Sequence, residues 1–102
     1  MRALVDYQND ILSHAIYPRM GDNFAFPAQE LAREVSATLS VLKVVQEEHD
    51  SKVGPNTREK VREALGGALC NLVVLCWELN IDVDDLMDAS IDKLDHRARY
   101  HR

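Results

Sequence analysis

Two long stretches of this 102-residue chain repeat apolar residues every three or four positions, and no other feature limits the fold as strongly. One runs from about residue 28 to 48, and the other from near Thr57 to Asn80. They predict amphipathic helices of about 21 and 24 residues, or about 30–36 Å of rise. The positions predicted to be buried are Leu31, Val35, Thr38, Leu42 and Val45 in the first helix, and Val61, Leu65, Ala68, Leu72, Leu75 and Leu79 in the second.

The ends of these two helices carry their own signals. Asn56 with Glu59 has the spacing of a capping box at the start of the second long helix, and Asn80 suits the left-handed residue that ends it. The first long helix has a regular polar face, which we expect to contact solvent. This face consists of Arg33, Ser36, Ser40, Lys43 and Glu47.

Two shorter helices are predicted near the ends of the chain. Residues 2–16 form one of them, which Pro18 ends, and the stretch YPRMGDNFAFP beyond it must be a loop because it holds two prolines and a glycine. Asp82 caps the last helix. Because no stretch predicts a strand, the expected fold is all-α, with four helices in a single domain over residues 1–102. The apolar positions of the last helix are Val83, Leu86, Met87, Ile91 and Leu94.

Composition and charge narrow the classes of partner. The net charge is −5 and basic residues gather only at the extreme C-terminus, which argues against nucleic acid. The start MRALVDYQND lacks the apolar core of a signal peptide, and no stretch approaches the ~18 apolar residues of a membrane span. Cys70 and Cys76 fall in one helix with Cα atoms about 9 Å apart, too far for a disulfide. We therefore expect free cysteines, a cytoplasmic protein and no membrane.

The long helices exceed what a compact monomer of this size requires. Their second apolar edges predict that two chains pack into one bundle, so we expect a homodimer or a higher assembly such as a homotetramer. An adjacent glycine pair, Gly66 and Gly67, stands inside the second long helix although each interior glycine costs a helix roughly 0.5–1 kcal/mol relative to alanine.

Four stretches of the sequence together resemble the MazG-like nucleotide pyrophosphohydrolases, members of the all-α NTP pyrophosphatase superfamily. They read YP..GDNFAFP..ELAREV, EALGGALCNL, ELNIDVDDL and DASIDKLDHR, and they cover about 85 residues in the family's order. The resemblance implies a four-helix MazG-like bundle completed by assembly of chains. It also implies a site where carboxylates from two facing helices bind Mg²⁺, so that a metal-bound water cleaves a nucleoside triphosphate to the monophosphate and pyrophosphate.

The family's metal-binding residues are mostly replaced in this sequence. LAREVSA matches the family's LAGEAGE, which places Glu34 at the first acidic position and Ala37 at the second. ALGG matches ELGD, so that Ala64 and Gly67 stand where acids are expected. The resemblance therefore implies that Gly67 marks a lost acid, whereas Gly66 is the family's own small residue that lets the helices approach closely. No catalytic residue and no metal ligand is assigned.

Neighbouring polar residues leave a reduced site open. Glu30 and Glu63, with Glu34, are residual metal candidates, although Glu63 is turned by about 100° from the expected position. Glu34, Asn71 and Lys93 are the nucleotide-binding candidates. Lys93 matches a lysine of the family's last helix that could meet a phosphate, and Asn71 could instead make a structural hydrogen bond.

Three functions remain open at this point. The first is a MazG-like protein that has lost catalysis and acts as a binding or interaction module, without a cofactor. The second is an active Mg²⁺-dependent nucleoside triphosphate pyrophosphohydrolase that uses Glu30, Glu34 and Glu63. The third is a nucleotide-binding sensor that does not hydrolyse its ligand. The loss of three acids at Ala37, Ala64 and Gly67 favours the first.

Overall fold

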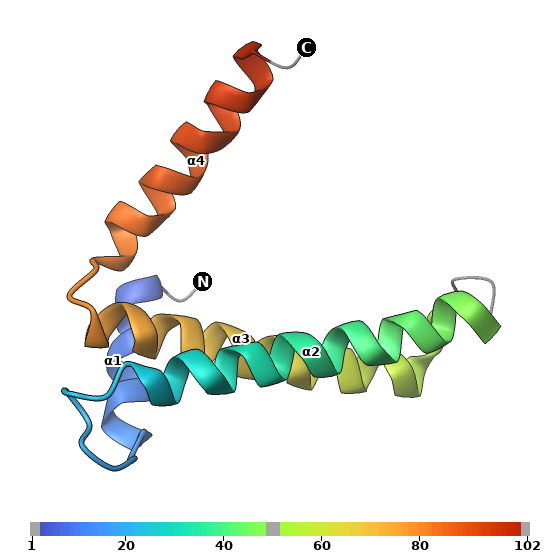
Figure 1. Ribbon diagram of the computed structural model, residues 1–102, viewed down its shortest axis with the longest axis horizontal. Helices are drawn as coiled ribbons and strands as arrows, with labels where there is room; N and C mark the ends of the chain where they lie inside the picture. The colour runs from blue at the N-terminus through green and yellow to red at the C-terminus, as the bar shows by residue number, and fades with distance from the viewer. Residues whose placement is uncertain (1–2, 49–51, 101–102) are drawn as a thin grey trace.

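The chain folds into helices joined by short loops (Figure 1). The computed structural model describes residues 3–48 and 52–100, and every regular element in these ranges is a helix. The prediction of an all-α fold is therefore confirmed. The helices are α1 (Leu4–His14), α2 (Ala25–Glu48), α3 (Pro55–Glu78) and α4 (Val83–Tyr100).

The N-terminal half contains the predicted helices with different ends. α1 ends at His14, two residues before the predicted end, and residues 1–2 lie outside the described part. α2 begins at Ala25 rather than near residue 28. The side chain of Asn23 accepts a hydrogen bond from the backbone N–H of Phe26 at 3.3 Å, which caps the start of the helix. Pro27 fits in this first turn because its missing N–H has no partner there in any helix.

Three predicted helix ends can be compared with the structure at α3 and at the start of α4. One is wrong and two are confirmed. α3 begins at Pro55 with Gly54 as its N-cap, so the predicted capping box at Asn56 does not form. Asn80 has a φ of 57° and is the left-handed residue expected after the helix. Asp82 caps α4, because its Oδ1 accepts a hydrogen bond from the backbone N–H of Asp84 at 2.9 Å.

The helices form an angle rather than a closed bundle. α2 and α3 run antiparallel and lie side by side over most of their length, while α1 packs across α3 at one end (Figure 1). α4 leaves that corner at 110° to α3, and its contacts with the rest of the chain are mainly with α1. The four helices of the described residues thus do not close into a bundle within a single chain.

Most of the buried residues lie where α1 and the loops meet the α2–α3 pair, and Thr38 and Val45 lie farther along α2. Within the predicted row of α2, Thr38 and Val45 are buried, whereas Val35 and Leu42 are exposed. In α3 the half-buried positions include a helical row at 61, 64, 68, 71 and 75. The row predicted for α3 therefore lies partly on a neighbouring face, where Leu65 is 53% exposed. The predicted solvent face of α2 is exposed throughout. The buried apolar residues are Tyr17, Val45, Val73, Val74, Cys76 and Val83.

The loop between α1 and α2 is held by a single carboxylate at the end of α3. Glu78 accepts hydrogen bonds from the Tyr17 hydroxyl at 2.5 Å and from the backbone N–H groups of Gly21 at 3.0 Å and Asn23 at 3.1 Å. The Tyr17 ring also stacks on Phe26, with centroids 4.8 Å apart. These contacts fix the entry of the chain into α2, and hence the register of α2 against α3.

The charge of Glu78 is favoured by these three donors. Burial disfavours its ionised form, but the hydrogen bonds from Tyr17, Gly21 and Asn23 outweigh burial and lower the pKa of the Glu78 carboxyl. Burial, and then the hydrogen bond and charge of Glu78, raise the pKa of the Tyr17 hydroxyl. The pair therefore consists of a neutral phenol and a carboxylate at neutral pH.

Candidate functional site

Glu34 of α2 and Gly67 of α3 face each other across the helix pair. A Cβ atom built on Gly67 would lie 2.8 Å from Cδ and 2.9 Å from Oε1 of Glu34. The Glu34 side chain therefore lies directly over the glycine and occupies the space that a side chain there would need. This contact places the two half-motifs of the sequence opposite each other, at the level where the resemblance puts a metal site.

The next turn of each helix carries a polar side chain that bonds to its own backbone. Oγ1 of Thr38 donates to the carbonyl oxygen of Glu34 at 2.9 Å, and Nδ2 of Asn71 donates to the carbonyl oxygen of Gly67 at 2.9 Å. The structural hydrogen bond considered for Asn71 is therefore present. With these bonds, both polar groups find partners inside the helix pair without a ligand.

The close contact expected at Gly66 lies instead at Gly67. A Cβ atom on Gly66 would meet no described atom within 4 Å, so the expectation that Gly66 allows close helix approach is wrong. The close approach is at Gly67, because the Glu34 side chain crosses it there. The physical reason is the turn of about 100° per residue, which directs adjacent positions to different faces of α3.

The other acidic candidates do not converge on Glu34. Glu30 forms an ion pair with Arg33 on the same helix, with 3.2 Å between Oε1 and Nη2. Glu63 is exposed, in line with its expected rotation away from the site. Of the positions where acids are replaced, Ala64 is half-buried and Ala37 is exposed. Within residues 3–48 and 52–100, no three His, Cys, Asp or Glu side chains are close enough together to hold a metal ion.

Lys93 lies in a separate hollow of about 590 Å³ at the corner between α1, α3 and α4. Neither Glu34 nor Asn71 lines this hollow, so the three nucleotide-binding candidates do not share it. Lys93 is the one charged residue of a largely apolar lining. The other lining residues are Leu4, Leu69, Leu72, Leu86, Met87, Ala89 and Ser90.

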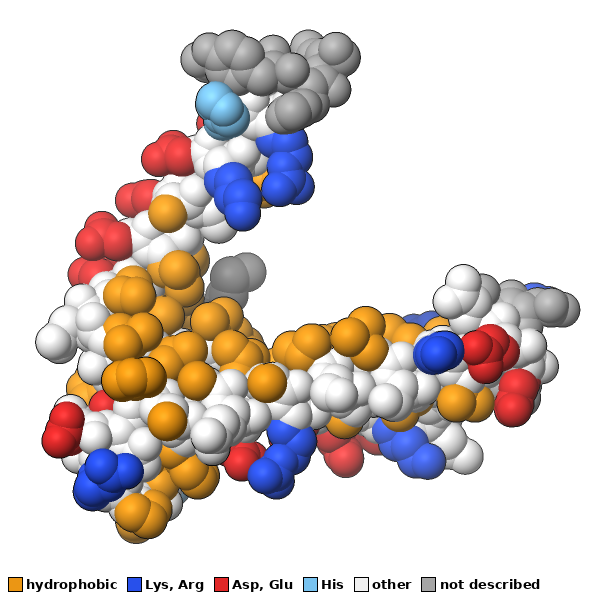
Figure 2. All heavy atoms as spheres, viewed as in Figure 1, with side chains coloured by type: hydrophobic (Ala, Val, Ile, Leu, Met, Phe, Trp, Pro, Cys, Tyr) orange, Lys and Arg blue, Asp and Glu red, His pale blue; other side chains and the backbone are white. Residues whose placement is uncertain are grey.

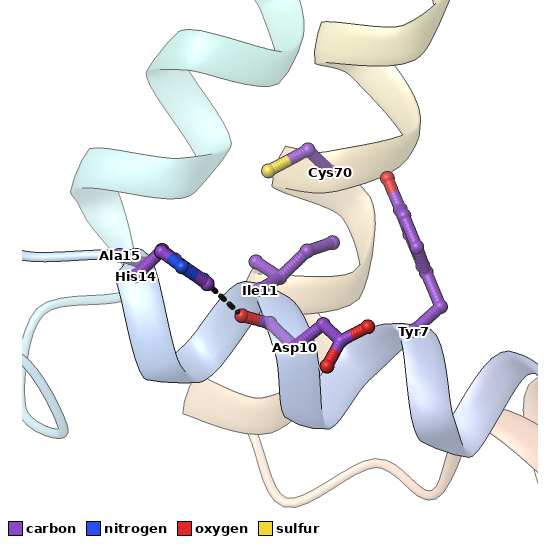
Figure 3. A pocket seen from close by; sticks show the side chains of 6 residues that line it. All are labelled: Tyr7, Asp10, Ile11, His14, Ala15 and Cys70. Carbon is purple, nitrogen blue, oxygen red and sulfur yellow. Dashed lines mark hydrogen bonds between the residues drawn. The ribbon is translucent and has the colours of Figure 1, made fainter.

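A second hollow, of about 410 Å³, lies between α1 and α3 (Figure 3). Its lining consists of Tyr7, Asp10, Ile11 and His14 of α1, Ala15 directly after that helix and Cys70 of α3, and no function was predicted for Asp10 or His14. The four-residue spacing of Asp10 and His14 is the signal in the sequence that places both side chains on one side of the helix. Nδ1 of His14 lies 2.8 Å from the backbone carbonyl oxygen of Asp10, which positions the imidazole (Figure 3).

The cysteines are free, as predicted, and neither is activated. Cys70 lines the hollow between α1 and α3 and is half-buried, whereas Cys76 is fully buried. Burial raises the pKa of both thiols, so both stay protonated at neutral pH. A protonated thiol is a poor nucleophile and a poor metal ligand, and these residues act as packing groups.

Comparison with known proteins gave no assignment: no protein-family model, no curated protein and no solved structure matches this chain. Within the described residues, no single helix is both long and apolar enough to cross a membrane. α3 and α4 together meet that test on length and composition alone, as a pair bent by 110°.

Proposed function

We propose that this chain is a MazG-like protein that has lost nucleoside triphosphate pyrophosphohydrolase activity and acts as a binding or interaction module. The contact between Glu34 and Gly67 carries the proposal. A position that bears an acid in the resembled family is a glycine here, and the space above it is filled by the one acid that remains. Two carboxylates cannot share that space unless one of them moves.

The surroundings of the remaining acids support the same conclusion. Mg²⁺ requires several oxygen ligands in near-octahedral geometry. Glu30 already pairs with Arg33, and Glu63 is exposed on another face of α3. Thr38 and Asn71 direct their polar atoms to backbone carbonyls. Of the three metal candidates, Glu34 contacts the facing helix, whereas Glu30 and Glu63 have these other surroundings.

An interaction module of this kind assembles through its apolar surfaces. We propose that the chain works as a homo-oligomer, a homodimer or homotetramer, in the cytoplasm. A nucleotide is the small ligand that the resemblance implies, with Glu34, Asn71 and Lys93 as the residues assigned to it. Their separation in one chain means that a shared site requires a change of arrangement or a neighbouring chain.

The direct test is release of pyrophosphate from nucleoside triphosphates in the presence of Mg²⁺ or Mn²⁺. We expect the wild-type chain to release no more than buffer does. Metal-dependent release that disappears in Glu34→Gln would contradict the proposal and favour an enzyme with a reduced set of ligands. A melting temperature raised by a nucleotide in the presence of a chelator would identify a nucleotide sensor instead.

A second experiment tests whether the replaced acids are the reason why the chain does not bind a metal ion. The triple variant A37E/A64E/G67D returns carboxylates to all three positions, and we expect it to bind Mn²⁺ more tightly than the wild type in calorimetry. The control is S36E/S40E/G66D, which adds the same number of acids at exposed positions. Equal Mn²⁺ binding by the two variants would mean that added charge, and not the facing geometry, attracts the metal.

A further inference from the structure

One side of the α2–α3 pair carries a continuous row of uncovered apolar side chains, here called the apolar band. Its members recur at i, i+4 and i+7 on each helix, and each directly follows a buried or half-buried position. Because the two helices are antiparallel, this shift of one residue turns both rows toward the same side of the pair. Figure 2 shows hydrophobic side chains gathered on the inner side of the angle between α4 and the helix pair. The band consists of Val35, Leu39 and Leu42 of α2 and Leu65, Leu69 and Leu72 of α3, which are 36–63% exposed.

α4 presents a matching apolar face. Met87, Ile91 and Leu94 lie on one side of the helix and are 43%, 57% and 56% exposed. The acidic residues of α4 occupy the next side of the helix, along the outer edge of the angle, and Lys and Arg side chains lie along the inner edge (Figure 2). Most of the stability of a helix in a protein comes from packing of its apolar face, so the apolar face of α4 requires a covering surface. The acidic residues are Asp84, Asp85, Asp88, Asp92 and Asp95.

The size of the uncovered surface is that of an interface between proteins. A compact monomer of this mass exposes about 5,800 Å², whereas this chain exposes 7997 Å². The excess of roughly 2,000 Å² is at least what each partner of a stable complex buries. The radius of gyration is 16.3 Å, compared with about 13 Å for a compact chain of 100 residues.

We propose that two copies of the chain form a two-fold symmetric dimer in which α4 of each copy lies along the apolar band of the other. Each chain carries one uncovered helix face and one uncovered band, so a two-fold exchange covers both kinds of surface at once. α4 rises about 27 Å, which fits within the roughly 36 Å of α2 and α3. The hollow beside Lys93 lies at the corner where band and α4 meet, so the surface is continuous.

Charge is compatible with a second copy of this chain as the occupant. The chain carries a net charge of −5, and two copies repel each other where acidic faces meet. In the exchanged dimer the apolar side of α4 faces the band, and the acidic side lies at the edge of the contact, next to solvent. The inference rests on the proposed role as an interaction module. It names a second copy of the chain as the partner, and α4 and the apolar band as the surfaces in contact.

The test compares neighbouring residues of α2 by sedimentation velocity at micromolar to submillimolar concentration. Leu39→Glu places a charge in the band, and we expect the dimer dissociation constant to rise by about a hundredfold. Ser40→Glu adds the same charge at the next position, which is exposed and turned away from the band, and we expect it to leave the dimer intact. Circular dichroism of each variant verifies that the helices still form.

Mixing two defective chains tests the exchange itself. Ile91→Lys places a charge on α4, and alone it is expected to be monomeric, like Leu39→Glu. The α4 of the Leu39→Glu chain and the band of the Ile91→Lys chain are both unaltered, so the mixture regains one intact contact. We expect native mass spectrometry to detect the heterodimer. A wild-type chain that is monomeric at submillimolar concentration, a dimer that survives Leu39→Glu, or a mixture without heterodimer would overturn the proposal, and none of these outcomes alters the pyrophosphate assay.

Discussion

At the scale of single residues, Gly66 and Gly67 differ in what surrounds them. Gly66 has open space where a Cβ atom would lie, and Gly67 has the Glu34 carboxyl group there. The backbone cost of glycine in a helix is the same at both positions. Only at Gly67 does a contact depend on the missing side chain.

This difference predicts unequal effects of alanine at the two positions. Gly66→Ala should raise the free energy of unfolding by about 0.5–1 kcal/mol, because it adds helix propensity and meets no described atom. Gly67→Ala should stabilise less, because the end of the Glu34 side chain must move away from a Cβ atom at 2.8 Å. Urea denaturation of both variants measures the difference. Equal stabilisation would contradict the close contact between Glu34 and Gly67.

Glu78 predicts how stability depends on pH. Its folded-state pKa is lowered, so its ionised form stabilises the fold at pH values above the unfolded pKa of about 4.3. That contribution is lost as the pH falls through the folded-state pKa. Glu78→Gln should therefore lower the melting temperature at neutral pH and reduce its loss in acid. One amide oxygen cannot accept the bonds that two carboxylate oxygens accept from Tyr17, Gly21 and Asn23.

The control for Glu78 is an acid that makes no comparable contacts. Glu47→Gln removes a charge from the exposed face of α2, and its melting temperature should stay close to that of the wild type from neutral pH into acid. If both variants respond to pH alike, the acid dependence comes from the overall charge of the chain and not from the bonds to the loop.

At the scale of elements, α4 depends on its first turn more than the other helices do, because it makes few contacts along its length. Asp82 supplies its side-chain cap, and removing such a cap costs about 1 kcal/mol. Asp82→Ala should therefore lower the free energy of unfolding by about that amount. Asp88→Ala, at an exposed position within the helix, should change it by less than about 0.5 kcal/mol. Urea denaturation at one fixed protein concentration compares the two, and equal losses would count against the cap.

At the scale of the whole molecule, much of the apolar surface of one chain is uncovered, so stability should depend on concentration. A dimer is stabilised by mass action, and a tenfold rise in protein concentration contributes about 1.4 kcal/mol per dimer. The melting temperature of the wild type should therefore rise with concentration, whereas that of Leu39→Glu should not. Calorimetry over a wide concentration range measures both. A constant wild-type melting temperature would indicate that one chain is stable by itself.

The sequence by itself determined the features that depend on neighbouring residues. Apolar spacing predicted four helices, Pro18 and Gly21 the loop, Asn80 the left-handed turn, and Asp82 the cap of α4. These features follow from local backbone sterics and nearby hydrogen bonds. The capping box at Asn56 failed because Pro55 and Gly54 supply an equally local start two residues earlier.

Only the tertiary structure decided which helix faces meet and which stay uncovered. The three donors on Glu78 come from residues more than 50 positions away, and the contact of Glu34 with Gly67 joins two helices. The exposure of Leu65 and the separate position of α4 likewise depend on which segments distant in the sequence pack together. Periodicity gives each helix an apolar side, but the choice of partner for that side depends on all the other surfaces of the molecule.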